Sequence, residues 1–306
     1  MLVIGLCVVL GGWALLASWN GLAGVRAPPI LHLLPFLVLL HLLQLQLAGL
    51  AWGALLPPPR PSSQRLWCLR IVREGIDSLL PVAQMGGEVV GAQLLARSLA
   101  PTLAAASVIL DLAVEFITQI VFLAAGLVTL ALISGHAPAG HWLILGAAAF
   151  ATLAVMLLAP RLGALRALEA VLGGIARRAP PLAGARVNGL DDAALALCRR
   201  RAGLTLGILI HLPAWGLGAV ETWLVLRAIG HAVSPAQAFV VESLGMAARS
   251  AGFAIPAALG VQEGGFVLAG AAIGVAAAPA VVLSLVKRLR EVLVGLIGLG
   301  IWRLAS

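Results

Sequence analysis

Two carboxylates stand four residues apart inside a long apolar stretch, where they could bind a proton or a cation. Asp111 and Glu115 fall within 101–133, and residues at this spacing share one face of a helix. An ionisable side chain in an apolar span costs roughly 2.5–3.5 kcal/mol on insertion scales, and two neighbouring ionised carboxylates repel each other. The pair therefore predicts either a site for a coupling proton or cation, or a structural pairing with an Arg from another segment.

A second charged group lies about a third of the way into the last apolar stretch, 279–302. Lys287 and Glu291 stand at i,i+4, and Arg288 and Glu291 at i,i+3, so both pairs can form along one helix. Glu291 can satisfy only part of this positive charge, which also includes Arg290. The remaining cations predict an anionic partner, either a lipid phosphate, which Arg binds bidentately, or carboxylates of the preceding segment.

Two similar interruptions, 79–88 and 254–263, divide the chain into related halves. In each, two apolar residues precede a Pro, a Gly follows four or five residues later, and a Glu falls seven residues after the Pro. Pro removes a backbone donor and Gly adds backbone freedom, so each stretch should break a helix. A broken helix in an apolar chain must line a cavity or be buried in protein. We therefore predict two re-entrant hairpins, one in each half.

Charged residues flank both interruptions at similar positions. Arg73 precedes the first and Glu88 follows its Pro; Arg249 and Glu263 do the same in the second, with Glu242 two helical turns before Arg249. Each Glu either caps the following half-helix through its N-terminal dipole or contacts a substrate directly.

The approach to the first interruption carries two further pairs at i,i+4, namely Arg70 with Glu74 and Arg73 with Asp77. At this spacing each pair can form along one helix. A lone His211 beside a Pro in the stretch 203–229 is interpreted as a hydrogen-bonded packing residue.

The composition predicts an all-α, polytopic membrane protein. The 306 residues are 61% hydrophobic and 10% charged, with a mean hydropathy of +1.07, whereas soluble domains carry about 25% charged residues. The net charge of +8 falls mostly between apolar spans, where it sets orientation, so no nucleic-acid partner is expected. Hydrolase, zinc-protease and P-loop motifs are absent from the sequence, and neither a catalytic residue, a metal nor a cofactor is predicted.

The spans and the positive charge give a topology for one membrane domain, 1–306. The predicted full spans are 2–19, 30–56, 101–133, 141–159, 203–229 and 279–302. Two re-entrant hairpins, 71–98 in the first half (1–160) and 236–275 in the second (203–306), complete the layout. Arg-rich segments at 60–73 and in the connection 161–202 place these on the cytoplasmic side. Both termini are then cytoplasmic and the hairpins enter from opposite sides, which is the inverted-repeat layout of secondary transporters.

The charged motifs resemble those of a known family. The run Arg73-Glu74-Gly75-Ile76-Asp77-Ser78-Leu79-Leu80-Pro81, followed by Gly86-Gly87-Glu88, resembles the first signature of the flippase-like transmembrane region of lysylphosphatidylglycerol synthases. The segment from Pro256 through Gly260 to Glu263 and the pair Lys287-Arg288 are similar to its later signatures. The run from Pro81 to Glu88 resembles the branch associated with hopanoid biosynthesis. The family often has Asn where this chain has Asp77.

The resemblance implies a lipid translocator in the bacterial cytoplasmic (inner) membrane, moving an amphipathic lipid, anionic or isoprenoid-derived, between leaflets. The soluble aminoacyl-transferring domain of the full-length synthases is absent from this sequence, so synthesis of a lysyl-lipid is not expected. The expected substrate-binding residues, most of them matched to the family's polar signatures, are Arg73, Glu88, Arg249, Glu263, Lys287 and Arg288.

Two other functions stay open at the level of sequence. One is an intramembrane lipid-modifying enzyme in which Asp111 and Glu115 act as acid and base. The other is a scaffold that binds lipid-biosynthesis enzymes, including those of a hopanoid pathway. A translocator needs access from both leaflets, whereas an enzyme needs access from one.

Overall fold

The apolar stretches fold as long helices. The computed structural model describes residues 27–80, 86–134, 189–252, 255 and 258–305, and every element in these ranges is helical. The long helices are α2 (Ala27–Leu55), α5 (Pro101–Ser134), α9 (Arg201–Ala228) and α12 (Ala277–Ala305). By length and composition, three helices in the described ranges could cross a membrane, at His32–Leu55, Pro101–Ser134 and Arg201–Ala228. The predicted spans 2–19 and 141–159 lie outside the described residues.

Both predicted interruptions separate a pair of shorter helices. The first pair is α3 (Ser63–Leu79) and α4 (Gly86–Leu95), and the second is α10 (Pro235–Ala251) and α11 (Val261–Ala271). The first arm begins at Ser63 instead of the predicted residue 71, because Ser62 caps it through a bond from the Arg65 backbone N–H to its Oγ. The basic residues before the first break therefore lie on a helix. At Leu80 the backbone becomes extended, as expected for a residue that precedes a Pro.

The connection predicted between the halves is partly helical. Helix α8 (Leu190–Cys198) packs on α5, and its apolar side joins the cluster that contains Ala106, Leu110, Leu190 and Leu197. The remainder of that connection, up to residue 188, lies outside the described residues.

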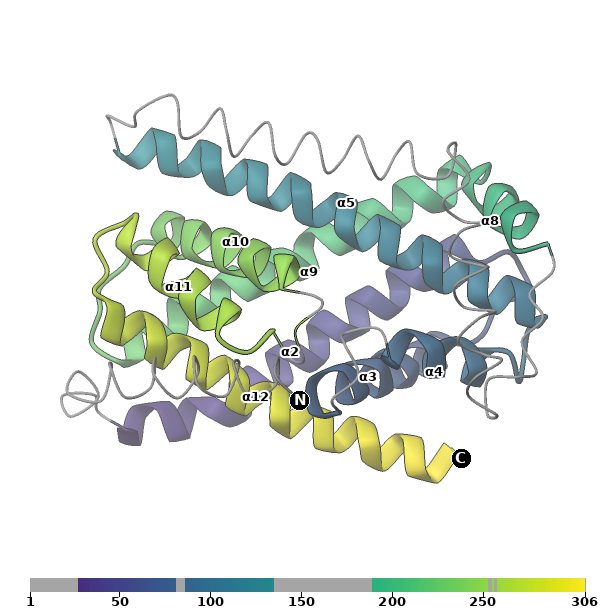
Figure 1. Cartoon of the computed structure of the whole chain (residues 1–306), viewed down its shortest axis with the longest axis horizontal. Coiled ribbons are helices and arrows are strands. Elements are labelled where there is room, and N and C mark those ends of the chain that lie inside the picture. Colours follow the sequence, from purple (N-terminus) through teal and green to yellow (C-terminus); the bar gives the residue numbers. More distant parts are fainter. Residues whose placement is uncertain (1–26, 81–85, 135–188, 253–254, 256–257, 306) are drawn as a thin grey trace.

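Helices α2 and α9 form an antiparallel pair through the middle of the molecule (Figure 1). A Cβ on Gly203 would touch the carbonyl of Ala54, and one on Gly207 would touch Leu55. Further along, Gln44 Nε2 donates to the carbonyl oxygen of Ala214 at 3.1 Å. As the residue numbers fall in one helix they rise in the other, so the two helices run in opposite directions.

Each half contributes one short helix that packs on a long helix of the other half. The order α2–α3–α4–α5 matches α9–α10–α11–α12: a long helix, a broken pair and a second long helix. Helix α3 packs on α12 of the other half, and α10 packs on α5 (Figure 1). Both contacts are antiparallel, since Ile71 lies near Gly298 and Leu79 near Gly295, while Gln119 bonds Ser250 and Gly126 lies near Ser243. In the described residues the order of long and short helices is therefore repeated, and the helix contacts α2–α9, α3–α12 and α5–α10 are antiparallel.

Apolar and polar side chains are distributed as expected for a lipid-facing bundle. Large apolar side chains are exposed on the outer helix faces, among them Leu39 at 64%, Leu132 at 78% and Leu209 at 58%. Charged side chains are buried, including Arg73, Asp111 and Lys287 at 2% or less. Ionisable groups in a membrane normally face the bundle interior or a watery cavity, and these face the cavity described next or the residues around it.

Candidate functional site

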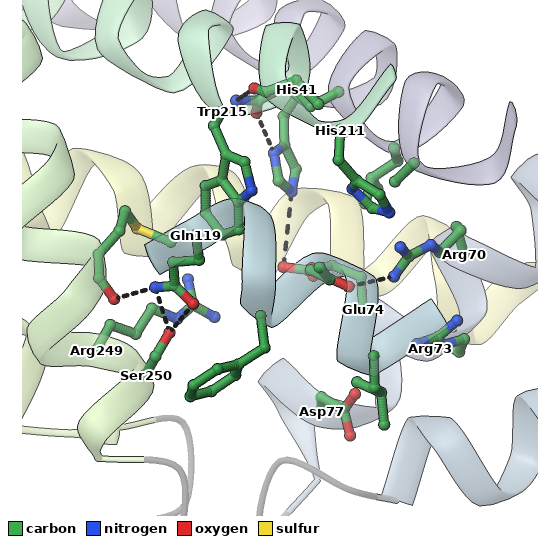
Figure 2. A pocket seen from close by; sticks show the side chains of 18 of the residues that line it. His41, Arg70, Arg73, Glu74, Asp77, Gln119, His211, Trp215, Arg249 and Ser250 are labelled. Carbon is green, nitrogen blue, oxygen red and sulfur yellow. Dashed lines mark hydrogen bonds and ion pairs between the residues drawn. The ribbon is translucent and has the colours of Figure 1, made fainter. Parts of the chain in front are cut away.

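A cavity of about 540 Å³ lies where the two halves meet. Side chains from α2, α3, α4, α5, α9, α10 and α12 line it, and Figure 2 shows that residues from both halves point into it. Its volume falls within the range of roughly 300–1,000 Å³ that is typical of small-molecule sites. Of the eight sequence-predicted site residues, five line it: Arg73, Glu88, Glu115, Arg249 and Lys287.

In the first half, two arginines of α3 hold the carboxylates of α5. Arg73 Nη1 donates to Asp111 Oδ2 at 2.7 Å, and Arg70 Nη1 donates to Glu115 Oε2 at 2.9 Å. Arg70 Nη2 also reaches Asp111 at 3.3 Å, and Arg73 Nε pairs with Glu88. The structural pairing expected for Asp111 and Glu115 is therefore present, and a coupling role for them stays a prediction.

Neither of the i,i+4 pairs that the spacing on α3 allows, Arg70–Glu74 and Arg73–Asp77, is among the ion pairs of the described residues. Arg70 and Arg73 turn toward α5 and α4 instead, because unpaired carboxylates are buried there. Glu74 Oε1 lies 3.6 Å from His41 Nε2 of α2. Asp77 Oδ1 accepts the backbone N–H of Gly87 at 2.8 Å. Asp77 thus satisfies the amino end of α4, the capping contact that the sequence had suggested for Glu88.

In the second half, the expected Lys287–Glu291 pair is also replaced. Lys287 Nζ lies 3.3 Å from Glu221 of α9 and 3.0 Å from Glu242 of α10. Glu291 instead binds Arg249 of α10. Lys287 therefore joins α12 to α9 and α10, and the buried carboxylates Glu221 and Glu242 share its positive charge.

Arg288 and Glu263 form the link between α12 and the second break. Arg288 Nε donates to Glu263 Oε1 at 3.0 Å, and its Nη1 lies 3.5 Å from Glu291, as expected at i,i+3. Glu263 Oε2 also accepts the Gly260 backbone N–H at 2.7 Å. The capping predicted for Glu263 is therefore present, and the same carboxylate carries an ion pair beside the cavity.

The two halves share part of their arrangement of charges and differ in one pair, because Glu88 binds Arg73 of the entry arm α3 while Glu263 binds Arg288 of the long helix α12. An Arg on the entry arm binds a Glu on the following long helix, Arg70 to Glu115 and Arg249 to Glu291. In each half, the first-turn Glu of the return arm, Glu88 or Glu263, binds an Arg. Each broken pair is therefore tied by ion pairs to the long helix that follows it.

Some residues at the cavity were not found from the sequence. His41 and Gln44 of α2 line it together, and Gln119 of α5 bonds Ser250 of α10 across it (Figure 2). His211 was interpreted as a packing residue, yet it lines the cavity with Nε2 3.7 Å from Asp111. The available signal was a polar side chain inside an apolar span, which is a functional hypothesis by default.

Within the described residues, the charged cluster, meaning the cavity-lining charges and those connected to them through one or more successive ion pairs, has more acids than bases. Its nine carboxylates are those of Glu74, Asp77, Glu88, Asp111, Glu115, Glu221, Glu242, Glu263 and Glu291. Its six cations are Arg70, Arg73, Arg249, Lys287, Arg288 and Arg290. The surplus of cations expected in the last helix is thus offset by acids from several other helices.

Comparison with protein families agrees with the motifs. A family model described as "Lysylphosphatidylglycerol synthase TM region" matches residues 1–298 of the chain. The matched region contains the cavity, both broken pairs and every residue of the charged cluster. Comparisons with curated proteins and with solved structures give no match.

Proposed function

The chain belongs to the lysylphosphatidylglycerol synthase TM family, and from that premise we propose that it moves an amphipathic lipid between membrane leaflets. The lipid carries an anionic head group and is a phospholipid or an isoprenoid-derived lipid. The cavity binds the head group while the acyl or isoprenoid chain stays among the exposed apolar faces of the helices.

The observation that carries this proposal is a charged cavity lined by helices from both parts of the chain, whose contacts α2–α9, α3–α12 and α5–α10 are antiparallel. A head group cannot cross the apolar core unless polar groups replace its water, and the buried ion pairs provide such groups. Secondary transporters place their sites where broken helices of two repeats meet. The packing of α3 on α12 and of α10 on α5 supports the same arrangement here.

Arg249 is the cation that the proposal assigns to the head-group phosphate. Its side chain is 16% exposed and lines the cavity, and within the described residues its ion pair is with Glu291 alone. Glu291 also contacts Arg288 and Arg290, so it keeps cationic partners when Arg249 turns to a phosphate. Exchange between Glu291 and a bound phosphate gives Arg249 an anionic partner both in the empty site and in the loaded one.

Rocking of the halves gives access from each side. The ion pairs tie each broken pair to its own long helix, so α3–α4–α5 and α10–α11–α12 can each move as a unit. The contacts between α3 and α12 and between α5 and α10 are where such units would slide. In this proposal the inverted layout, with hairpins entering from opposite sides, makes the two end states equivalent.

The test is lipid movement in vesicles reconstituted with the purified protein. A fluorescent phosphatidylglycerol and a fluorescent isoprenyl phosphate serve as probes, and a membrane-impermeant quencher reports the outer leaflet. Wild-type protein and Arg303→Gln, which changes an exposed residue of α12, should move a probe. Arg249→Gln should lose movement at an unchanged melting temperature. Equal movement by Arg249→Gln would contradict the phosphate assignment, and a covalently altered probe would indicate an enzyme.

A further inference from the structure

The ring of His41 meets two neighbours whose hydrogen-bond requirements conflict. Nδ1 lies 2.9 Å from Arg290 Nη1 and 2.7 Å from Gln44 Oε1. A guanidinium can only donate, and an amide oxygen can only accept. A single ring nitrogen cannot accept from Arg290 and donate to Gln44 at the same time.

Rotating the Gln44 amide does not resolve this conflict. Gln44 Nε2 donates to the carbonyl oxygen of Ala214 at 3.1 Å. A flipped amide would set its oxygen against that carbonyl oxygen and lose the bond between α2 and α9. The position of Gln44 Oε1 beside the His41 ring is therefore fixed by the neighbouring helix.

The hydrogen positions on the His41 ring decide which neighbour is satisfied. The neutral tautomer with hydrogen on Nδ1 would set the Nε2 lone pair against the Glu74 carboxylate, so it is disfavoured. In the neutral ring with hydrogen on Nε2, Nδ1 accepts from Arg290. In the imidazolium, Nδ1–H donates to Gln44 Oε1, and Nε2–H faces Glu74 Oε1 at 3.6 Å (Figure 2). Arg290 must then withdraw from the ring, but it keeps its bonds to Glu221 at 2.9 Å and Glu291 at 3.3 Å.

Acidic and basic side chains surround His41. Within the described residues the charged cluster has nine carboxylates and six Lys or Arg side chains. Charged and titratable side chains face the His41 region from each helix that packs on α2: Arg70 and Glu74 of α3, Glu115 of α5, His211 and Glu221 of α9, and Lys287 and Arg290 of α12. The two of opposite sign in direct contact with the ring are Glu74 and Arg290.

We infer that His41 is a proton-binding site in the cavity, and that its proton is the coupling ion of translocation. The inference rests on the proposed function and deepens it. Its evidence is the competition between Arg290 and Gln44 for Nδ1, together with the position of Glu74 beside Nε2. Asp111 and Glu115, the residues first predicted to couple, are held by Arg70 and Arg73, and His41 takes that role.

Proton binding changes which helices α2 is bound to. In both states Nε2–H faces Glu74 of α3. The neutral ring also connects α2 with α12 through Arg290, whereas the imidazolium gives up Arg290 and pairs its positive charge with Glu74. Since α12 and α3 come from different halves, the proton alters the contact between the units that the proposed mechanism moves. The bond from Gln44 to Ala214 is common to both states and keeps α2 on α9.

The experiment has two readouts on the full-length protein. The first is an NMR titration of ¹⁵N-labelled histidine in lipid nanodiscs between about pH 5 and pH 8, the range in which His side chains ordinarily change charge. The His41 signal is identified by its loss in His41→Gln or His41→Asn. The second is the pH dependence of fluorescent phosphatidylglycerol movement in vesicles, with His32→Gln as the matched control because His32 is exposed on the same helix.

We expect the His41 ring signal to titrate, and the wild-type and His32→Gln rates to change together across this pH range. The His41→Gln rate should become independent of pH. A His41 signal that stays constant, a pH dependence that persists in His41→Gln, or a rate that follows sodium concentration instead of pH would overturn the inference. If wild-type protein moves no probe at any pH, translocation itself fails, while the NMR titration still decides whether His41 binds a proton.

Discussion

Two arginines of another helix converge on the buried carboxylate of Asp111. It is fully buried, with Arg73 at 2.7 Å and Arg70 at 3.3 Å. Removing one member of a buried ionic group leaves uncompensated charge. We expect Asp111→Asn to lower the stability of the detergent-purified protein, by on the order of 3 kcal/mol, measured as a fall in melting temperature.

The same variant separates the stability role from the coupling role. Asp111→Asn protein that still inserts should keep the pH dependence of lipid movement, whereas His41→Gln should lose it. Normal stability together with a lost pH dependence in Asp111→Asn would return the coupling site to α5.

At Glu263 a charge can be removed with little loss of hydrogen bonding, whereas at Arg288 it cannot. Glu263→Gln keeps an acceptor for the Gly260 backbone N–H, and Arg288 keeps Glu291 and the Ala258 carbonyl. Arg288→Ala instead leaves the buried Glu263 carboxylate without this ion pair. We therefore expect both variants to stop lipid movement, with the larger fall in melting temperature for Arg288→Ala. Equal movement by Glu263→Gln and wild type would show that this charge has no part in transport.

Residue types were predictable from the sequence, whereas their partners were not. Arg70, Arg73 and Lys287 were recognised as charges inside an apolar protein, and the i,i+4 rule supplied partners on the same helix. That rule describes helices whose other faces meet water. In this bundle the desolvated carboxylates of other helices compete more strongly, and no spacing within one helix reveals them.

Helices α3 and α12 approach each other so closely that their contact requires small residues. A Cβ on Gly298 would collide with the carbonyl oxygen of Ile71, whereas one on Gly300 meets no atom within 4 Å. We expect Gly298→Ala to destabilise the protein by about 1–3 kcal/mol through overpacking. Gly300→Ala, on the same helix, should be neutral or slightly stabilising. Thermal unfolding of the two variants gives the comparison, and equal melting temperatures would contradict the packing described here.

Helix breaks were predictable because their cause is local. A Pro followed closely by Gly weakens a helix through local causes, and both predicted breaks are present, although Pro213 with Gly216 lies inside the continuous helix α9. The start of the first arm was misplaced because its signal, a capping Ser62 after Pro57-Pro58-Pro59, lies among arginines that were assigned to a loop. The positive-inside rule locates charge relative to the membrane but does not distinguish a loop from an exposed helical turn.

Opposite orientation of the halves is a prediction for the whole molecule. The antiparallel pairs α2–α9, α3–α12 and α5–α10 agree with the predicted alternation of spans, although the helices alone do not locate the membrane. In a variant without native cysteines, Ser63→Cys and Ala232→Cys should be labelled from opposite sides of sealed vesicles. Both positions are exposed. Ser98→Cys, after the return arm, should be labelled from the same side as Ser63→Cys. Labelling of Ser63→Cys and Ala232→Cys from the same side would exclude the inverted layout.

Access from both leaflets distinguishes a translocator from an enzyme or a scaffold. Vesicles containing wild-type protein carry a fluorescent phosphatidylglycerol or isoprenyl phosphate in both leaflets, and an impermeant quencher is added outside. Translocation predicts that nearly all fluorescence disappears, because inner-leaflet probe reaches the outer leaflet, and that the extracted probe has an unchanged mass. If only the outer-leaflet fraction is quenched for both probes across about pH 5 to pH 8, as in protein-free vesicles, the protein does not move these lipids and the account is contradicted.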